Sequence, residues 1–158
     1  MLKPNFEKPL GKIVSGLYVL TAQHEGKLTG TLTSFVIQTG FDPPTVGISL
    51  NKDRYIYELV KKSGRSVLNI VGENQVNLLK HFSKRFQPDE EVFSDVKLKK
   101  ISEYGPVLDS SVGYLELELM GEFQLNDHIF VFSKITGGEE LNDEMKPWVH
   151  IRKNGMHY

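Results

Sequence analysis

A short polar stretch, NKDR (Asn51–Arg54), lies between the alternating segment 45–50 and an amphipathic helical pattern. The N–H groups in the first turn of a helix lack intrahelical partners, and the helix dipole there favours an anion. Lys52 and Arg54 would add positive charge, and Ser49 would add a hydroxyl. These groups suit a phosphate. An ordinary helix start with two solvated cations is the simpler interpretation of these residues alone, because no P-loop or GxGxxG motif accompanies them.

Earlier in the chain lies the stretch Thr31, Leu32, Thr33 and Ser34, in which the two threonines and the serine place hydroxyl groups where the strand pattern of residues 28–39 is expected to bend. Hydroxyls and nearby backbone groups can satisfy the polar edge of a flat ring while apolar neighbours cover its face. The β propensity of threonine explains the same segment without any ligand. The segment therefore predicts a strand and leaves a ring-binding role open.

Histidines are the other residues with obvious chemical potential, and they are His24, His81, His128, His150 and His157. None belongs to an HExxH motif or to a close metal-binding pair. No GxSxG motif supports a hydrolase built from Ser, His and Asp. These residues indicate neither a metal centre nor a hydrolase.

The composition excludes several classes of protein. The 158 residues include 19 Lys and Arg against 20 Asp and Glu, for a formal net charge of -1. This balance argues against a dedicated nucleic-acid-binding protein. Because there is no cysteine, disulfides, thiolate zinc sites, iron–sulfur clusters and thiol redox chemistry are excluded. Any electron transfer would need a bound cofactor.

The length favours one domain, residues 1–158. The N-terminal residues show no apolar core of a signal peptide. No run approaches the roughly 18 apolar residues of a membrane span. We therefore expect a cytoplasmic protein that has no membrane contact.

Most of the chain shows strand patterns. In residues 45–50 apolar side chains alternate with small ones, and in residues 114–123 leucines alternate with glutamates. Glu25-Gly26 and Asn126-Asp127 are expected to form turns. The predicted strands are 12–24, 28–39, 45–50, 66–72, 114–123 and 128–138.

Two helical patterns interrupt these strands. The first covers residues 53–64, with Asp53 predicted as its N-cap and Gly64 as its stop. The second covers residues 73–86, and residues 87–105 are predicted to be a charged loop. Short strands with two early helices predict a closed or nearly closed antiparallel barrel.

Five segments occur in a distinctive order: GLYVLTA, TGTLTSFVIQTGFDPPTVGISLNKDR, SVLNIVGENQVNLLKHFSKRF, LNDHIFVFSKITGG and PWVHIRKNGMHY. The most diagnostic piece is Gln-x-x-Phe-x-Pro-Pro, from Gln38 to Pro44. In this order the segments resemble the flavin reductase-like family of FMN-binding split-barrel proteins, over residues 10–158. HFSKRF and the closing HIRKNGMHY resemble the flavin reductase modules of flavodiiron proteins still more closely. The resemblance implies a mainly β fold, a split β-barrel of the antiparallel, Greek-key type with a few helices.

The same resemblance implies an FMN site. The residues that would contact the flavin ring and ribityl chain are Thr31, Leu32, Thr33, Ser34, Gln38, Thr39 and Gly40. Those that would hold the phosphate are Ser49, Leu50, Asn51, Lys52 and Arg54, with His81, Lys84 and Arg85 implied at the phosphate or at a partner subunit. Relatives usually carry serine at Gly40, and many carry threonine at Leu32, so this chain lacks two family hydroxyls.

The implied activity is transfer of a hydride from NADH or NADPH to the flavin, with His128 or His150 as the side chain that would assist. A second hypothesis is an FMN electron carrier that exchanges electrons with a rubredoxin, a ferredoxin or a diiron protein. A third is a binding module without chemistry. The resemblance also implies a homodimer.

Overall fold

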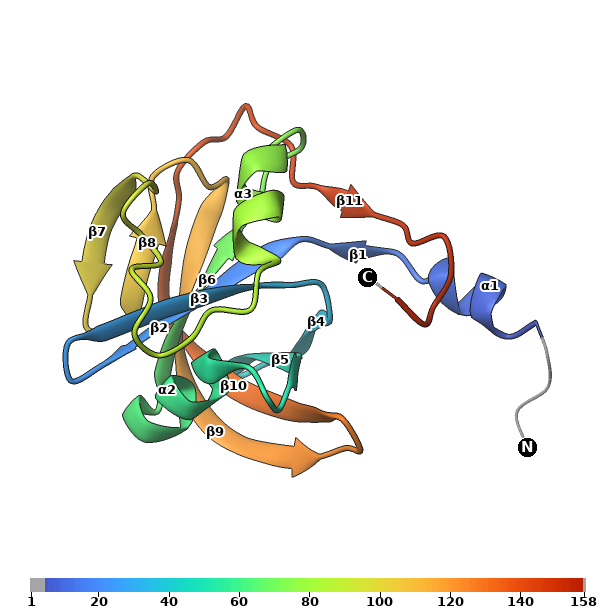
Figure 1. Ribbon diagram of the computed structural model, residues 1–158, viewed down its shortest axis with the longest axis horizontal. Helices are drawn as coiled ribbons and strands as arrows, with labels where there is room; N and C mark the ends of the chain where they lie inside the picture. Colours follow the sequence, from blue (N-terminus) through green and yellow to red (C-terminus); the bar gives the residue numbers. More distant parts are fainter. Residues whose placement is uncertain (1–4, 158) are drawn as a thin grey trace.

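The structure is a computed structural model, and it describes residues 5–157 (Figure 1). The strands of its largest sheet are β2 (Tyr18–His24), β3 (Lys27–Thr33), β4 (Val36–Phe41), β5 (Pro44–Asn51), β6 (Arg65–Ile70), β9 (Gly113–Gln124) and β10 (His128–Glu140). Two small sheets pair β1 (Ser15–Gly16) with β11 (Val149–His150) and β7 (Leu98–Ser102) with β8 (Gly105–Leu108). The helices are α1 (Glu7–Gly11), α2 (Tyr55–Ser63) and α3 (Val76–Phe82).

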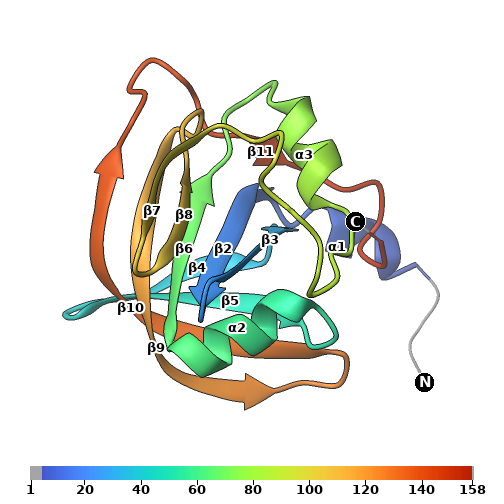
Figure 2. The same ribbon diagram turned by 60° about the vertical axis from the view of Figure 1, so that its left-hand side comes forward.

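The order of strands in the large sheet is β3-β2-β6-β9-β10-β5-β4, and all neighbours are antiparallel. β3 and β4 are therefore the two edge strands. Ser34 and Phe35 alone connect them, so the two edges of the sheet must lie close together. The sheet curls into a barrel that stays open along this seam (Figure 2). The predicted split antiparallel barrel is confirmed.

The two faces of β2 belong to two different cores. Leu20 and Ala22 point into the barrel, where they pack in one cluster with Leu59 of α2. Val19 points the other way and packs in a second cluster with Phe82 of α3. The period-two alternation of a strand produces this arrangement. α2 and α3 consequently lie on different sides of β2 and β3 (Figure 2).

The first helix predicted from the sequence, residues 53–64, is α2, and it begins at Tyr55. Arg54 is its N-cap and makes no side-chain capping hydrogen bond, so the prediction of Asp53 as N-cap is wrong. The Asp53 N–H instead donates to Asn51 Oδ1 at 2.9 Å, which forms a turn before the helix. Gly64 ends the helix in the left-handed conformation with φ 68°, as predicted.

Other boundaries also differ from the sequence patterns. The patterns 12–24 and 28–39 each divide into two strands, because the chain must leave the β2–β3 pair at Tyr18 and Thr33. The second helix predicted from the sequence, residues 73–86, is α3, which covers only Val76–Phe82. The predicted turns at Glu25-Gly26 and Asn126-Asp127 are confirmed.

The prediction of a loop over residues 87–105 is wrong for the last part of that segment. It contains β7, whose side chains are mostly exposed. Lys99, Lys100 and Ile101 are all exposed, so the strand lacks an apolar alternation. A two-stranded sheet at the surface does not require alternating apolar side chains. Within residues 5–157, no helix has the length and apolar character needed to cross a bilayer.

Candidate functional site

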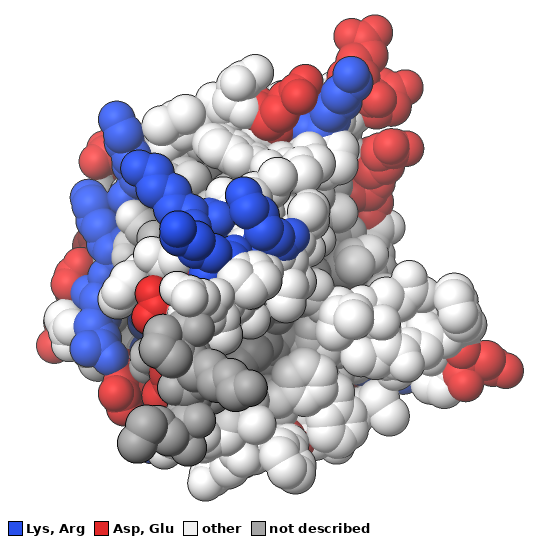
Figure 3. Space-filling model, turned by 90° about the vertical axis from the view of Figure 1, so that its right-hand side faces the viewer, with Lys and Arg blue, Asp and Glu red and all other residues white. Residues whose placement is uncertain are grey.

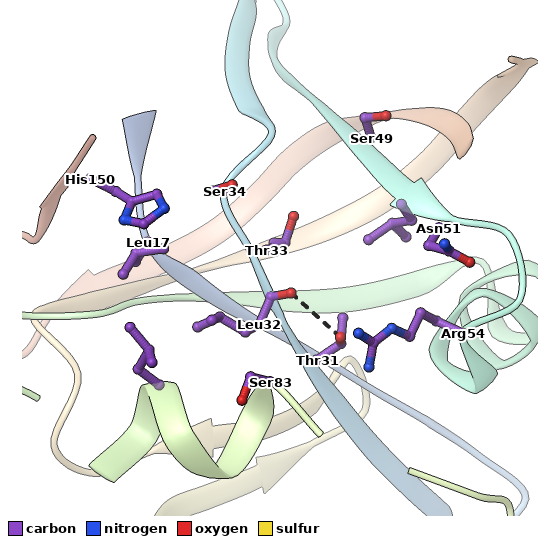
Figure 4. A pocket seen from close by; sticks show the side chains of 12 residues that line it. Leu17, Thr31, Leu32, Thr33, Ser34, Ser49, Asn51, Arg54, Ser83 and His150 are labelled. Carbon is purple, nitrogen blue, oxygen red and sulfur yellow. Dashed lines mark hydrogen bonds between the residues drawn. The ribbon is translucent and has the colours of Figure 1, made fainter. Parts of the chain in front are cut away.

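A cavity of about 310 Å³ opens where the ends of β3 and β5 face α3 and β11 (Figure 4). Small-molecule sites typically measure about 300–1,000 Å³. Leucines form part of the wall, and hydroxyl, amide, imidazole and guanidinium groups form the rest. The lining residues are Leu17, Thr31, Leu32, Thr33, Ser34, Ser49, Leu50, Asn51, Arg54, Leu79, Ser83 and His150.

One wall of the cavity is the edge of β3. Thr31, Leu32 and Thr33 all line it, although consecutive side chains of a strand point to opposite faces. The cavity must therefore run along the strand edge. β3 is an edge strand, so its outward N–H and C=O groups have no neighbouring strand among the described residues. This edge can hydrogen-bond a flat ligand as it would another strand.

The hydroxyls of this wall are poorly satisfied. Thr31 Oγ1 donates to the carbonyl of Leu32 at 3.4 Å, a long contact that is drawn in Figure 4. Ser34 is 3 % exposed, and among the described residues its Oγ is the buried side-chain atom without a hydrogen-bond partner. Buried polar atoms in folded proteins are normally paired. The Ser34 hydroxyl is therefore available to bond with a water molecule or a ligand in the cavity.

The opposite side of the cavity carries positive charge. Arg54 stands at the N-terminus of α2, and its Nη1 donates to the backbone carbonyl of Lys84 at 2.7 Å. This bond holds the guanidinium between α2 and the segment after α3. Because α2 has no side-chain cap, its first N–H groups and its dipole also favour an anion. Ser49, Asn51 and Ser83 add polar groups nearby.

The remaining predicted phosphate residues lie outside the cavity lining. Lys52 follows β5, and its N–H donates to the carbonyl of Asp127. Arg85 Nη2 lies 3.7 Å from Asp53 Oδ2. His81 Nε2 lies 2.7 Å from the carbonyl of Val92, which directs this ring toward the loop after α3. The face of the molecule that carries α1 shows Lys and Arg side chains gathered in a band along one edge (Figure 3).

Gln38, Thr39 and Gly40 also lie outside the lining residues. They belong to β4, where Gln38 and Thr39 are exposed. Gln38 Nε2 donates to the carbonyl of Gly40, and Thr39 Oγ1 donates to Thr45 Oγ1. These bonds remain within the β4–β5 hairpin. The hairpin projects from the barrel (Figure 2).

The two predicted catalytic histidines occupy different places. His150 lines the cavity from β11, which pairs with β1 at Ser15. Burial lowers the pKa of His150 below its ordinary value of 6.5, and the charge of Arg152 lowers it further. His128 lies outside the lining residues, and its Nδ1 is 3.1 Å from Asp127 Oδ1. The His128 hydrogen bond lowers the pKa of the Asp127 carboxyl.

Three lining residues escaped the sequence analysis: Leu17, Leu79 and Ser83. Leu79 lies on the apolar face of the predicted helix 73–86, so its burial could be expected from the sequence but its place in a cavity could not. Leu17 directly precedes β2 and Ser83 directly follows α3, and no local pattern distinguishes them from the other residues of the predicted strand 12–24 and helix 73–86. Within the described part of the chain, no group of His, Asp and Glu is arranged to hold a metal ion.

Comparisons with known proteins agree with this architecture. The flavin reductase like domain matches residues 10–157. Diflavin flavoprotein A 1 of Synechocystis sp. is 40% identical over 159 residues, which cover 99% of this chain and 28% of that protein. The chain therefore spans less than a third of the length of this relative.

Solved structures show the same fold. Nitrilotriacetate monooxygenase component B from Mycobacterium thermoresistibile is 28% identical with a TM-score of 0.82, over 94% of this chain and 82% of that one. The styrene monooxygenase flavin reductase from Pseudomonas putida S12 is 25% identical with a TM-score of 0.78, over 93% and 92% of the two chains. The chain belongs to the flavin reductase-like family of oxidoreductases.

Proposed function

We propose that the cavity binds FMN and that the chain is an NAD(P)H-dependent flavin reductase. The observation that carries this proposal is the division of the cavity wall into two kinds of surface. The β3 edge offers uncharged hydroxyl and backbone groups, and the Arg54 side offers a guanidinium at a helix N-terminus. A ligand with a flat polar ring and a phosphate fits this division.

The residues of the chain would bind and orient this ligand. Leu17, Leu32 and Leu79 supply apolar contact, while Ser34 and the β3 backbone supply hydrogen bonds at the ring edge. Arg54 would pair with the phosphate by charge-assisted hydrogen bonds. Bound FMN would supply the two-electron acceptor that a nicotinamide donor requires. The rate would come mainly from holding the reactants in contact and from excluding water.

His150 is suited to act as a neutral group beside the ligand. Its lowered pKa keeps the imidazole uncharged near neutral pH. An uncharged imidazole can hold a proton on one ring nitrogen and accept a hydrogen bond on the other. In this position it would orient a donor or ligand without repelling the cationic nicotinamide that forms when the donor is oxidised.

The direct test is an anaerobic absorbance experiment on the protein loaded with FMN. NADH and NADPH are added separately, and bleaching of the flavin band is followed. Rapid bleaching by either nucleotide is expected. A protein that acquires no flavin spectrum would contradict the binding site. A protein that binds FMN and is bleached by dithionite alone would contradict the reductase activity.

The alternative is an FMN electron carrier that serves a rubredoxin, a ferredoxin or a diiron protein. It is favoured by the relatives named diflavin flavoproteins, in which the matched region is about 28% of the protein. Such a region would work as one redox module among others. Stopped-flow mixing of the reduced protein with oxidised rubredoxin tests it. Transfer faster than NAD(P)H oxidation would favour the carrier.

We also propose that the chain forms a homodimer through the outer face of β4, β5, β10 and β9. Ile37, Gly47, Phe132 and Gly121 lie in one row across these strands. Phe123 and Ile37 are 65% and 62% exposed to solvent. Phe130 packs over Gly47 and Phe132 packs over Gly121, where a Cβ atom would overlap the phenyl rings. A flat apolar face of this kind suits a two-fold interface.

A further inference from the structure

The wall of the cavity that carries His150 belongs to a segment with few backbone bonds to the barrel. His150 and Arg54 line the cavity at opposite ends (Figure 4). Two residues before His150, the Trp148 N–H donates to the carbonyl of Val71 at 2.9 Å. Beyond that bond, β11 pairs with β1 over two residues of each strand. A pair of strands this short is marginally stable in water, so other contacts must hold His150 in place.

Arg152 supplies such contacts two residues after His150. Its guanidinium carbon lies 5.1 Å from the centroid of the Phe35 ring, which is a cation–π contact. Its Nη1 donates to the carbonyl of Gly155 at 3.3 Å, and its backbone N–H donates to the carbonyl of Gly11 at 3.2 Å. The side chain of Arg152 therefore joins the C-terminal segment to the barrel, and its backbone joins the same segment to α1.

Phe35 is itself held in place by the barrel. Together with Ser34 it forms the connection between β3 and β4, and its carbonyl accepts the Ser49 N–H at 2.9 Å. The centroid of its ring also lies 5.9 Å from that of the His128 ring on β10. The contact with Arg152 consequently attaches the C-terminal segment to a part of the barrel that β5 and β10 already hold.

Arg152 is placed to act on the cavity through His150. It is not one of the lining residues. Its side chain is half-buried, whereas those of its neighbours Ile151 and Lys153 are exposed. Burial lowers the pKa of His150, and the positive charge of Arg152 lowers it further. The arginine therefore bears on both the place and the protonation of the histidine.

We propose that Arg152 is a positioning residue that keeps His150 in the wall of the cavity by clamping the C-terminal segment onto Phe35. The proposal rests on the proposed function of the cavity. The segment is attached to the barrel on both sides of His150, at Trp148 and at Arg152. Without the guanidinium the second attachment is lost, and this wall opens to solvent. A bound flavin should then leave the cavity faster, while the barrel stays folded.

The test is a double-mutant cycle on the protein loaded with FMN. Arg152→Ala, His150→Ala and the double variant are compared with Lys153→Ala, which removes an exposed positive charge at the neighbouring position. Stopped-flow fluorescence measures the rate of FMN dissociation. We expect Arg152→Ala to raise this rate about tenfold, through the loss of one cation–π contact and one hydrogen bond. The double variant should be no faster than the faster single variant, and Lys153→Ala should leave the rate unchanged.

A second measurement needs no flavin. The pKa of His150 in the empty protein is followed by NMR titration of its imidazole. It should rise toward the ordinary value of 6.5 in Arg152→Ala and stay low in Arg152→Lys, which keeps the charge. Because lysine lacks the planar guanidinium, the FMN dissociation rate of Arg152→Lys should be intermediate. Phe35→Leu removes the ring from the barrel side, and it should accelerate FMN dissociation even if Arg152→Ala does not fold.

Three outcomes separate the possible errors. Additive effects of the two substitutions in the cycle would overturn the proposal, because Arg152 would then act independently of His150. A lower Tm for Arg152→Ala, with the FMN dissociation rate and the pKa of His150 both unchanged, would also overturn it and leave a purely structural arginine. Failure of the wild type to bind FMN would overturn the proposed function, and the titration of His150 would still decide whether Arg152 holds it.

Discussion

Two groups of buried polar side chains in this protein are satisfied to very different degrees. Inside the sheet, Asn69 Nδ2 donates to the carbonyl of Val19 and to Thr21 Oγ1, at 3.2 and 3.3 Å. Its Oδ1 accepts the N–H of Leu108 at 2.9 Å. At the cavity wall, Ser34 Oγ has no partner among the described residues. The first group ties β6 to β2 and β8, whereas the second lines the cavity.

The difference separates polar groups that hold the fold together from polar groups that are available to a ligand. Asn69 is fully buried, and its side chain joins β6 to the backbone of β2 and β8. Its bonds are made entirely within the protein. The cavity wall combines Ser34, the weakly bonded Thr31 and the edge of β3. A measurement of stability should respond to the first group, and a measurement of binding should respond to the second.

The largest effect on stability is expected for Asn69→Leu. The Leu108 N–H would lose its partner in a fully buried place, and a leucine side chain would stand among polar groups that Asn69 now contacts. Each such group costs about 1–3 kcal/mol, so we expect the free energy of unfolding to fall by about 3 kcal/mol. Urea denaturation measures this change. A loss similar to that of an exposed substitution, below about 0.5 kcal/mol, would show that the network is not structural.

The next effect concerns binding at the charged side of the cavity. Arg54→Ala should raise the Kd of FMN about tenfold to hundredfold, because a hydrogen bond to a charged group contributes about 1.5–3 kcal/mol. Riboflavin lacks the phosphate, so its Kd should not change. Lys52→Ala is the matched control, since Lys52 does not line the cavity. Equal losses for FMN and riboflavin would place Arg54 away from the phosphate.

An exposed apolar region provides a third case for the comparison. Phe123→Lys places a charge on the outer face of β9, and we expect the dimer dissociation constant to rise at least about tenfold. Ile101→Lys, on β7 in a different sheet and 53% exposed, is the control. Light scattering after size-exclusion chromatography measures both. If the wild type is a monomer at all concentrations, the proposed interface is wrong.

The smallest effect is expected for the pH dependence of stability. Because the pKa of His150 is lowered in the folded protein, the unfolded chain binds a proton first as the pH falls. The contribution of His150 is therefore fully present above its ordinary pKa of 6.5 and is lost below it. His150→Gln should flatten the fall in Tm between about pH 8 and pH 5. His157→Gln, at an exposed position in the same segment, should leave the slope unchanged.

The sequence patterns predicted most of the sheet because burial in a strand follows local alternation. Val46, Ile48 and Leu50 are all nearly fully buried, as their spacing indicates. The patterns failed to predict β7, where the preferences of neighbouring residues do not determine the strand. β7 is a surface strand with Lys99 and Lys100, and its pairing with β8 depends on distant contacts.

The candidate site shows the same division. Nine of the twelve residues that line the cavity are among those that the family resemblance implies for the flavin site, most of them in two short segments at the ends of β3 and β5. Lys52 and Arg54 are near neighbours in the sequence, yet only Arg54 is among the lining residues. The direction of a side chain at the start of a helix depends on the turn that precedes it, here the bond between Asp53 N–H and Asn51 Oδ1. Composition and spacing do not specify that direction.

The sequence by itself determined the antiparallel barrel, its hairpin turns and the absence of cysteine chemistry, because these follow from periodicity, turn residues and composition. Only the tertiary structure decided which polar groups remain unpaired. Ser34 and Ser111 are both serines in connecting segments, and nothing in their neighbouring residues distinguishes a hydroxyl that faces a cavity from one that meets a carbonyl. That distinction arises when β3, β5, α3 and β11 meet, since a hydrogen bond depends on atoms that are distant in the sequence.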